Sequence, residues 1–196
     1  MNNNKDNNLK AVMESVKCLR QFYKEIASFL LVLDKLVEKK DYKCTGGKNV
    51  IIDTSHNLKN FESWLPVVFY RNYKKNQKTL FTTNIVLHQE VEKIEIKEPL
   101  FIATKYKFNK GFKRDAWEGT SWSIYFYTSV NAMKTGEIYD KKLIFDKTNK
   151  KRLKDNGEWK DEEFDMVEDL KFMAIPLLEI NDEKDIENKI LNKFDL

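Results

Sequence analysis

Residues Leu9 to Val37 read LKAVMESVKCLRQFYKEIASFLLVLDKLV and contain neither glycine nor proline. Apolar or aromatic side chains recur in this stretch at alternating spacings of three and four residues. That spacing places them on one side of a helix, and a stripe of this length must be covered by the rest of the chain or by another chain. The stripe consists of Leu9, Val12, Val16, Leu19, Tyr23, Ile26, Leu30, Leu33 and Val37.

The two halves of the expected helix differ in how much apolar surface they carry. In the second half, Phe22, Phe29 and Leu36 add a second row beside the stripe, which predicts burial on more than one side. The first half carries the stripe with polar residues around it, so it is the better candidate for contact with a partner. The partner-contact residues predicted there are Leu9, Val12, Val16 and Leu19.

The boundaries of the helix follow from the residues that flank it. Residues 1–8 contain five asparagines and one apolar residue, so we expect a disordered tail there and a helix over residues 9–40. Gly46-Gly47 marks the break that follows. We expect residues 9–196 to form a single domain, since the chain length fits one core.

Beyond the helix, strand-like segments alternate with turn signals. Five segments carry the residue types of strands: Leu80 to His88, Val91 to Lys97, Leu100 to Phe108, Ser121 to Val130 and Glu137 to Phe145. Asn49 to Asp53 and Phe172 to Ile180 are predicted strands as well, the latter at an edge or with a bulge because of Pro176. Leu58 to Tyr73 is predicted as a helix that is interrupted or begins near Pro66.

These elements predict an α+β fold. We expect the long N-terminal amphipathic helix to pack on a mostly antiparallel sheet of about five or six strands, formed within residues 49–180. A short helix over residues 181–195, capped by Asn181 or Asp182, completes the domain. A doubly wound parallel fold is disfavoured because residues 79–145 leave little room for helices between strands.

Cysteine content and hydropathy bound the class of protein. Two cysteines, Cys18 and Cys44, do not form a disulfide framework, and the N-terminus does not resemble a signal peptide, so we expect a cytoplasmic protein. The longest apolar stretch, Ile26 to Val37, is interrupted by Ser28, Asp34 and Lys35 and is shorter than the roughly 20 residues of a membrane span. We therefore expect no membrane partner.

The net charge of +4 is distributed unevenly along the chain. Residues 155–196 hold 14 acidic and five basic side chains, which leaves 17 acidic and 30 basic side chains in residues 1–154. Either the acidic part packs near the basic body and neutralises it, or the basic body binds a polyanion. The first interpretation is the simpler one, because charge asymmetry by itself only suggests a nucleic-acid partner.

One set of residues is a candidate for catalysis. Asp53 in a predicted strand, followed by Glu95 and Lys97, has the residue types with which metal-dependent nucleases hold a divalent cation near an attacked phosphate. The alternation of apolar and charged residues in a half-exposed strand also accounts for Glu95 and Lys97. The sequence therefore leaves the nuclease as an alternative and favours a protein without enzymatic activity.

Other motifs fall short of a cofactor or metal site. His56 and His88 are the only histidines, too few for a typical zinc site, and we expect no bound metal. Thr45-Gly46-Gly47-Lys48 is similar to the end of a phosphate-binding loop, but Asn49 replaces the hydroxyl residue that would follow the lysine. We expect no cofactor.

Basic residues interleaved with aromatics suggest a nucleic-acid surface. Lysines attract phosphates and exposed rings stack on bases. Each stretch of basic and aromatic residues is also explained by an ordinary strand with one solvated face. Lysine outnumbers arginine 31 to 4, which argues against base-specific recognition. The candidate contacts are Arg71, Lys74, Lys75, Lys105, Lys107, Lys110, Lys113 and Arg114.

Three hypotheses about function remain. The favoured one is a non-catalytic interaction module that binds a protein partner or itself, because the helix offers a contact face and no motif identifies a reaction. The second is a nucleic-acid-binding protein or nuclease. The third is a small-molecule sensor whose pocket is lined by the aromatic residues Trp117, Trp122, Tyr125, Phe126 and Tyr127.

Overall fold

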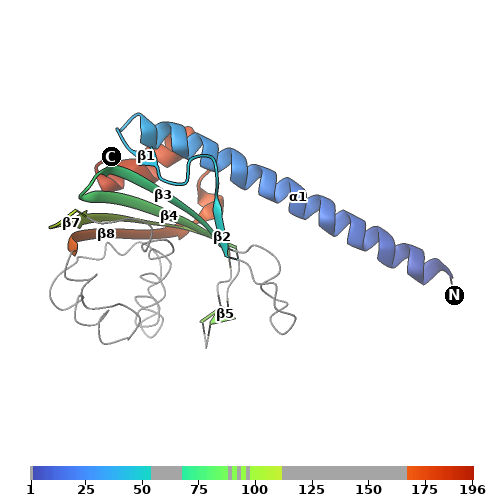
Figure 1. The fold of residues 1–196 in the computed structure, drawn as a ribbon. Helices are drawn as coiled ribbons and strands as arrows, with labels where there is room; N and C mark the ends of the chain where they lie inside the picture. Colours follow the sequence, from blue (N-terminus) through green and yellow to red (C-terminus); the bar gives the residue numbers. More distant parts are fainter. Residues whose placement is uncertain (1, 54–67, 88–89, 92–93, 96–97, 112–166) are drawn as a thin grey trace.

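The fold is a long helix and a C-terminal helical segment laid over one face of an antiparallel sheet (Figure 1). It is seen in a computed structural model that describes residues 2–53, 68–87, 90–91, 94–95, 98–111 and 167–196. The expected α+β class is confirmed. The predicted strands at Ser121 to Val130 and Glu137 to Phe145 lie outside the described residues.

Within the described residues, the main sheet has six antiparallel strands. Its order is β1-β3-β4-β7-β8, and β2 pairs with the first half of β3 while β1 pairs with its second half. A separate two-stranded sheet is formed by β5 and β6. The strands are β1 (Lys43–Cys44), β2 (Ile51–Asp53), β3 (Val68–Asn76), β4 (Thr79–Val86), β5 (Glu90–Val91), β6 (Ile94–Glu95), β7 (Leu100–Phe108) and β8 (Val167–Pro176).

The helix α1 (Asn2–Glu38) has a buried half and a protruding half (Figure 1). Its second half packs on the sheet, where Leu33 and Val37 have no exposed surface. Its first half extends beyond the sheet edge. The helix begins at Asn2, within the stretch expected as a tail, which agrees with the low cost of extending a helix once it is nucleated.

The core lies between this helix and the sheet, and the C-terminal segment closes it. Phe81 and Phe101 project from the sheet. The Phe194 ring contacts Phe81 edge to face, with 5.2 Å between the ring centroids. Asp182 accepts a hydrogen bond from the Asp185 amide, so one of the two predicted caps is confirmed. The segment contains η2 (Leu177–Glu179), α5 (Glu183–Asp185), the π-helical turn η3 (Ile186–Ile190) and the 3-10 turn η4 (Leu191–Phe194).

Two local predictions are wrong. Val68 to Tyr73 was predicted within a helix but forms most of β3, because every second side chain faces α1: the Phe69 ring meets Tyr23, and Arg71 and Tyr73 bond to Asp34. Val91 to Lys97 was predicted as one strand, but it spans the pairing of β5 with β6. Pro176 ends β8, the last strand of the described sheet, as expected for an edge.

Candidate functional site

The protruding half of α1 presents an apolar stripe to solvent. Leu9, Val12 and Val16 are 63%, 59% and 46% exposed, Met13 beside them is also exposed, and Leu19 is half-buried. Polar contacts of this half run along the helix itself, such as the ion pair of Lys17 with Glu14 at 2.8 Å. A row of large aliphatic side chains at this exposure is typical of a contact surface.

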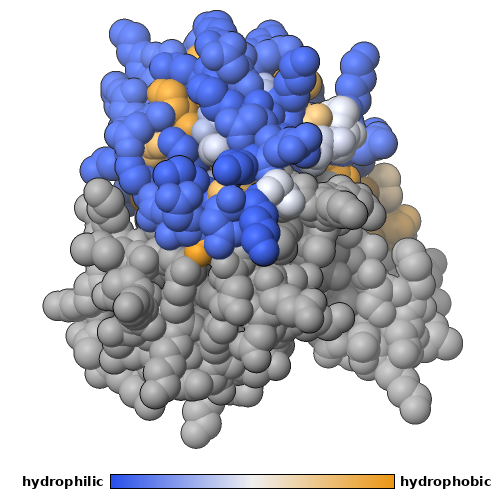
Figure 2. Space-filling model, turned by 60° about the vertical axis from the view of Figure 1, so that its left-hand side comes forward, coloured by the Kyte–Doolittle hydropathy of each residue, from blue (hydrophilic) through white to orange (hydrophobic). Residues whose placement is uncertain are grey.

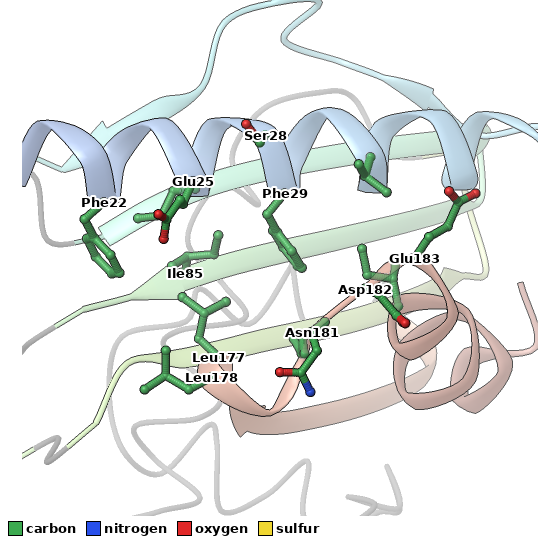
Figure 3. A pocket seen from close by; sticks show the side chains of 14 residues that line it. Phe22, Glu25, Ser28, Phe29, Ile85, Leu177, Leu178, Asn181, Asp182 and Glu183 are labelled. Atoms are coloured by element: carbon green, nitrogen blue, oxygen red, sulfur yellow. The ribbon is translucent and has the colours of Figure 1, made fainter.

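A groove of about 460 Å³ runs between the middle of α1 and the C-terminal segment (Figure 3). Phe22 and Phe29 point into it from the helix, and Ile85, Leu177 and Leu178 lie across from them. The Phe29 ring is held edge to face against Phe101 at 5.5 Å, so this wall is fixed by the core. Three carboxylates, those of Glu25, Asp182 and Glu183, line the groove as well.

The described residues that line the groove are mainly apolar. Among the described residues that line it, Ser28 carries the one hydroxyl group, which donates to the Lys24 carbonyl oxygen at 2.9 Å, and the Asp182 carboxylate caps a helix. None of these described residues is a histidine or a cysteine. The groove therefore suits an apolar group, with carboxylates at its margin.

Beneath α1, a buried charge cluster joins the helix to the sheet. Arg71 Nε donates to Asp34 Oδ1 at 3.0 Å, Arg71 Nη2 pairs with Asp34 Oδ2, and the Tyr73 hydroxyl donates to Asp34 Oδ1 at 2.7 Å. The hydrogen bond with Asp34 raises the pKa of Arg71, and burial raises the pKa of Tyr73 well above its ordinary value. The cluster joins the middle of α1 to β3 by polar contacts.

Arg71, one of the predicted nucleic-acid contacts, is therefore buried and bonded within the protein. Its side chain is 5% exposed, and its Nη1 group donates to the Asn49 carbonyl oxygen. Sequence reasoning missed the pairing because Asp34 lies 37 residues earlier in the chain. The available signal was Asp34 itself, a charged residue in an otherwise apolar run of the helix.

The other predicted cations within the described residues gather at one end of the main sheet. Lys74 and Lys75 end β3, while Lys105, Lys107 and Lys110 lie in or just after the second half of β7. Lys105 is half-buried and donates to the Phe194 carbonyl oxygen at 2.6 Å; burial and nearby positive charge lower its pKa. Lys113 and Arg114 lie outside the described residues.

The predicted catalytic residues are placed in different sheets. Asp53 ends β2 of the main sheet, opposite Val68, whereas Glu95 lies in β6 of the small sheet, opposite Glu90. Lys97, His56 and His88 fall outside the described residues, as do the aromatic residues of the predicted pocket. Within the described part of the chain, no group of three or more histidine, cysteine, aspartate or glutamate side chains is arranged to hold a metal ion.

Comparison of the chain with protein-family models, with curated proteins and with solved structures gave no match. Among the residues that the structure describes, every helix is too short or too polar to span a membrane.

Proposed function

We propose that the protein is a non-catalytic interaction module that associates with a second copy of itself through the protruding half of α1. The observation that carries this proposal is the exposure of Leu9, Val12 and Val16 on a helix whose other half is fixed in the core. Its two free cysteines, Cys18 and Cys44, favour a reducing compartment, and we place its action in the cytoplasm.

The stripe has a length and a side-chain spacing that suit packing against a second helix. Residues 2 to 21 form about 30 Å of helix at a rise of about 1.5 Å per residue. Side chains spaced by three and four residues fit between those of a second helix, and two antiparallel copies related by a twofold axis present the same stripe to each other. Such a contact is self-complementary and needs no other partner.

The energetics permit a stable pair. Full burial of an aliphatic side chain contributes about 1.5–3 kcal/mol, and each copy brings Leu9, Val12, Met13 and Val16. Association costs on the order of 4–15 kcal/mol in lost rigid-body freedom. Eight partly buried side chains are sufficient to offset that cost and leave a dimer of moderate affinity.

Size-exclusion chromatography with light scattering tests the proposal. The wild-type mass is expected to rise from one copy to two as concentration increases, and Val12→Glu is expected to abolish the rise, since it puts a charge in the stripe. Ala11→Glu is the matched control, because Ala11 is exposed, adjacent in sequence and outside the stripe. A wild-type chain that stays monomeric throughout, or equal effects of the two substitutions, contradicts the proposal.

A further inference from the structure

Lysines from separate parts of the sequence meet where the end of α1 passes the end of β3. Lys43 of β1 pairs in register with Lys74 of β3. The Lys75 Nζ group donates to the Lys40 carbonyl oxygen at 3.2 Å, which places the residues that follow α1 against the same strand. Adjacent positions of an antiparallel pair lie about 4.5–5.5 Å apart, so like charges here are close neighbours.

The same end of the sheet receives the lysines of β7. The Phe108 amide donates to the Lys78 carbonyl oxygen at 2.8 Å, and Lys107 is in register with Thr79. The turn between β3 and β4, which contains Lys78, is therefore beside the end of β7, where Lys110 follows. Lysines thus occur on β1, on β3, in the β3–β4 turn and at the end of β7, where Lys107 is paired with Glu168 of β8 at 3.1 Å.

Four of these lysines are exposed to solvent. Lys40, Lys43, Lys78 and Lys110 are exposed, and none of them forms an ion pair with a residue that the structure describes. Figure 2, which brings this end of the molecule forward, shows a mostly hydrophilic surface over its coloured part. Burial is the main cause of the lowered pKa of Lys105; the nearby Lys171 and Lys75 add to it, whereas Asp195 and Asp169 oppose it.

We propose that this lysine-rich end of the sheet binds the phosphate backbone of a nucleic acid. Four adjacent strands span about 15 Å at their usual spacing of roughly 4.8 Å, and phosphates of one duplex strand follow each other every 3.4 Å or so along the axis. A row of this length can contact more than one phosphate of the same strand. An extended row of charges suits a polymer better than a single small anion.

The use of lysine instead of arginine on this surface indicates contact with the phosphate backbone and not with the bases. Lysine is a point charge that neutralises phosphate, whereas the planar arginine fork supplies the commonest bidentate contact to guanine. Arg71, the arginine nearest in β3, is buried with Asp34. Binding is therefore expected to be independent of sequence and strongly dependent on salt. This proposal does not rest on self-association, because the surface lies at the opposite end of the molecule from the protruding half of α1.

Fluorescence anisotropy with a labelled mixed-sequence DNA, single-stranded and duplex, tests the proposal on the full chain. The test variant is Lys43→Glu/Lys78→Glu/Lys110→Glu. The matched control is Lys10→Glu/Lys17→Glu/Lys24→Glu, whose residues are exposed along the outer side of α1 and change the net charge of +4 by the same amount. Circular dichroism verifies that both variants are folded, and Lys→Gln at the three test positions replaces the first variant if it does not fold.

The expected result is binding at low salt that the test variant weakens by about tenfold or more, while the control changes it by about twofold or less. The slope of log K against log salt should decrease in magnitude by about 0.9 for each lost phosphate contact. Absence of binding at low salt, or equal losses in both variants, overturns the proposal. Binding to phosphatidylserine vesicles but not to DNA overturns it too, because the ligand is then an anionic membrane.

Discussion

The carboxylate of Asp34 in α1 and the guanidinium of Arg71 in β3 form a two-point ion pair in the interface between helix and sheet. The Tyr73 hydroxyl adds a third bond to the same carboxylate. Apolar contacts such as those of Leu33 hold the helix onto the sheet without direction, whereas this pair requires one rotation and one axial position of α1. The orientation of the protruding half therefore depends on a pair buried beneath the other half.

Asp34→Ala is expected to lower the free energy of unfolding by about 3–5 kcal/mol, because it leaves the Arg71 guanidinium buried without its counter-charge. Urea unfolding followed by circular dichroism measures the loss. Glu14→Ala is the control, since the Glu14–Lys17 pair is exposed and pairs of this kind contribute about 0–1 kcal/mol. Comparable losses in the two variants would show that the Asp34–Arg71 pair is not a structural anchor.

The double variant Asp34→Leu/Arg71→Met distinguishes the effect of the two charges on stability from the effect of side-chain packing at the same position. Replacing both charges with apolar side chains of similar size removes the desolvation cost, so the double variant should be more stable than Asp34→Ala alone. The same urea experiment measures it. A double variant at or below the stability of Asp34→Ala would mean that packing, not charge, dominates at this position.

Because one half of α1 is buried and the other is exposed, replacing an apolar side chain by alanine is expected to lower stability much more in the buried half. Leu33→Ala should cost about 2–5 kcal/mol, because the side chain is fully buried in the core. Val12→Ala should change stability by about 0.5 kcal/mol or less when measured at a concentration where the chain is monomeric, because Val12 is exposed. Thermal melting of the two variants and the wild type gives the comparison, and a large loss at Val12 would place the first half of α1 in the core.

Alkaline pH is expected to destabilise the protein through Tyr42. Burial raises the pKa of Tyr42 to about 12, from 10.0 in an unfolded chain. Between these values the unfolded chain releases the phenolic proton and the folded chain retains it, so the free energy of unfolding falls as pH rises from 10 to 12. Below pH 10 the contribution is fully present.

Urea unfolding at several pH values, with absorbance of the phenolate as a second readout, measures this effect. Tyr42→Phe cannot ionise at this position, so its stability should fall less steeply over the same range. Identical pH profiles for the variant and the wild type would assign the alkaline loss to other groups.

The two thiols should differ in reactivity. Cys18 is exposed on α1, whereas Cys44 is half-buried and burial raises the pKa of its thiol. Because the thiolate is the reactive form, a disulfide reagent at mildly alkaline pH should modify Cys18 quickly and Cys44 slowly. Cys18→Ser should remove the fast phase and Cys44→Ser the slow one. Equal rates in the native protein would contradict the burial of Cys44.

The candidate sites were predictable from the sequence to different degrees. The exposed stripe of Leu9, Val12 and Val16 follows directly from local periodicity, and the absence of a second row beside it marked this half as uncovered. The lysine surface was only partly predictable. Lys75 and Lys110 were visible as basic residues, but their proximity depends on the pairing of β1, β3, β4 and β7. Lys43 and Lys78 were not singled out, because neither belongs to a distinctive motif.

The sequence by itself determined the long helix, the antiparallel character of the sheet and the burial of the helix's second half. These properties depend on residue types at fixed short spacings, which are local. Only the tertiary structure decided that Arg71 is neutralised by Asp34 and that Lys43, Lys78 and Lys110 share one end of the sheet. Strand pairing and helix packing bring these residues together across long stretches of chain, and no short-range pattern encodes that proximity.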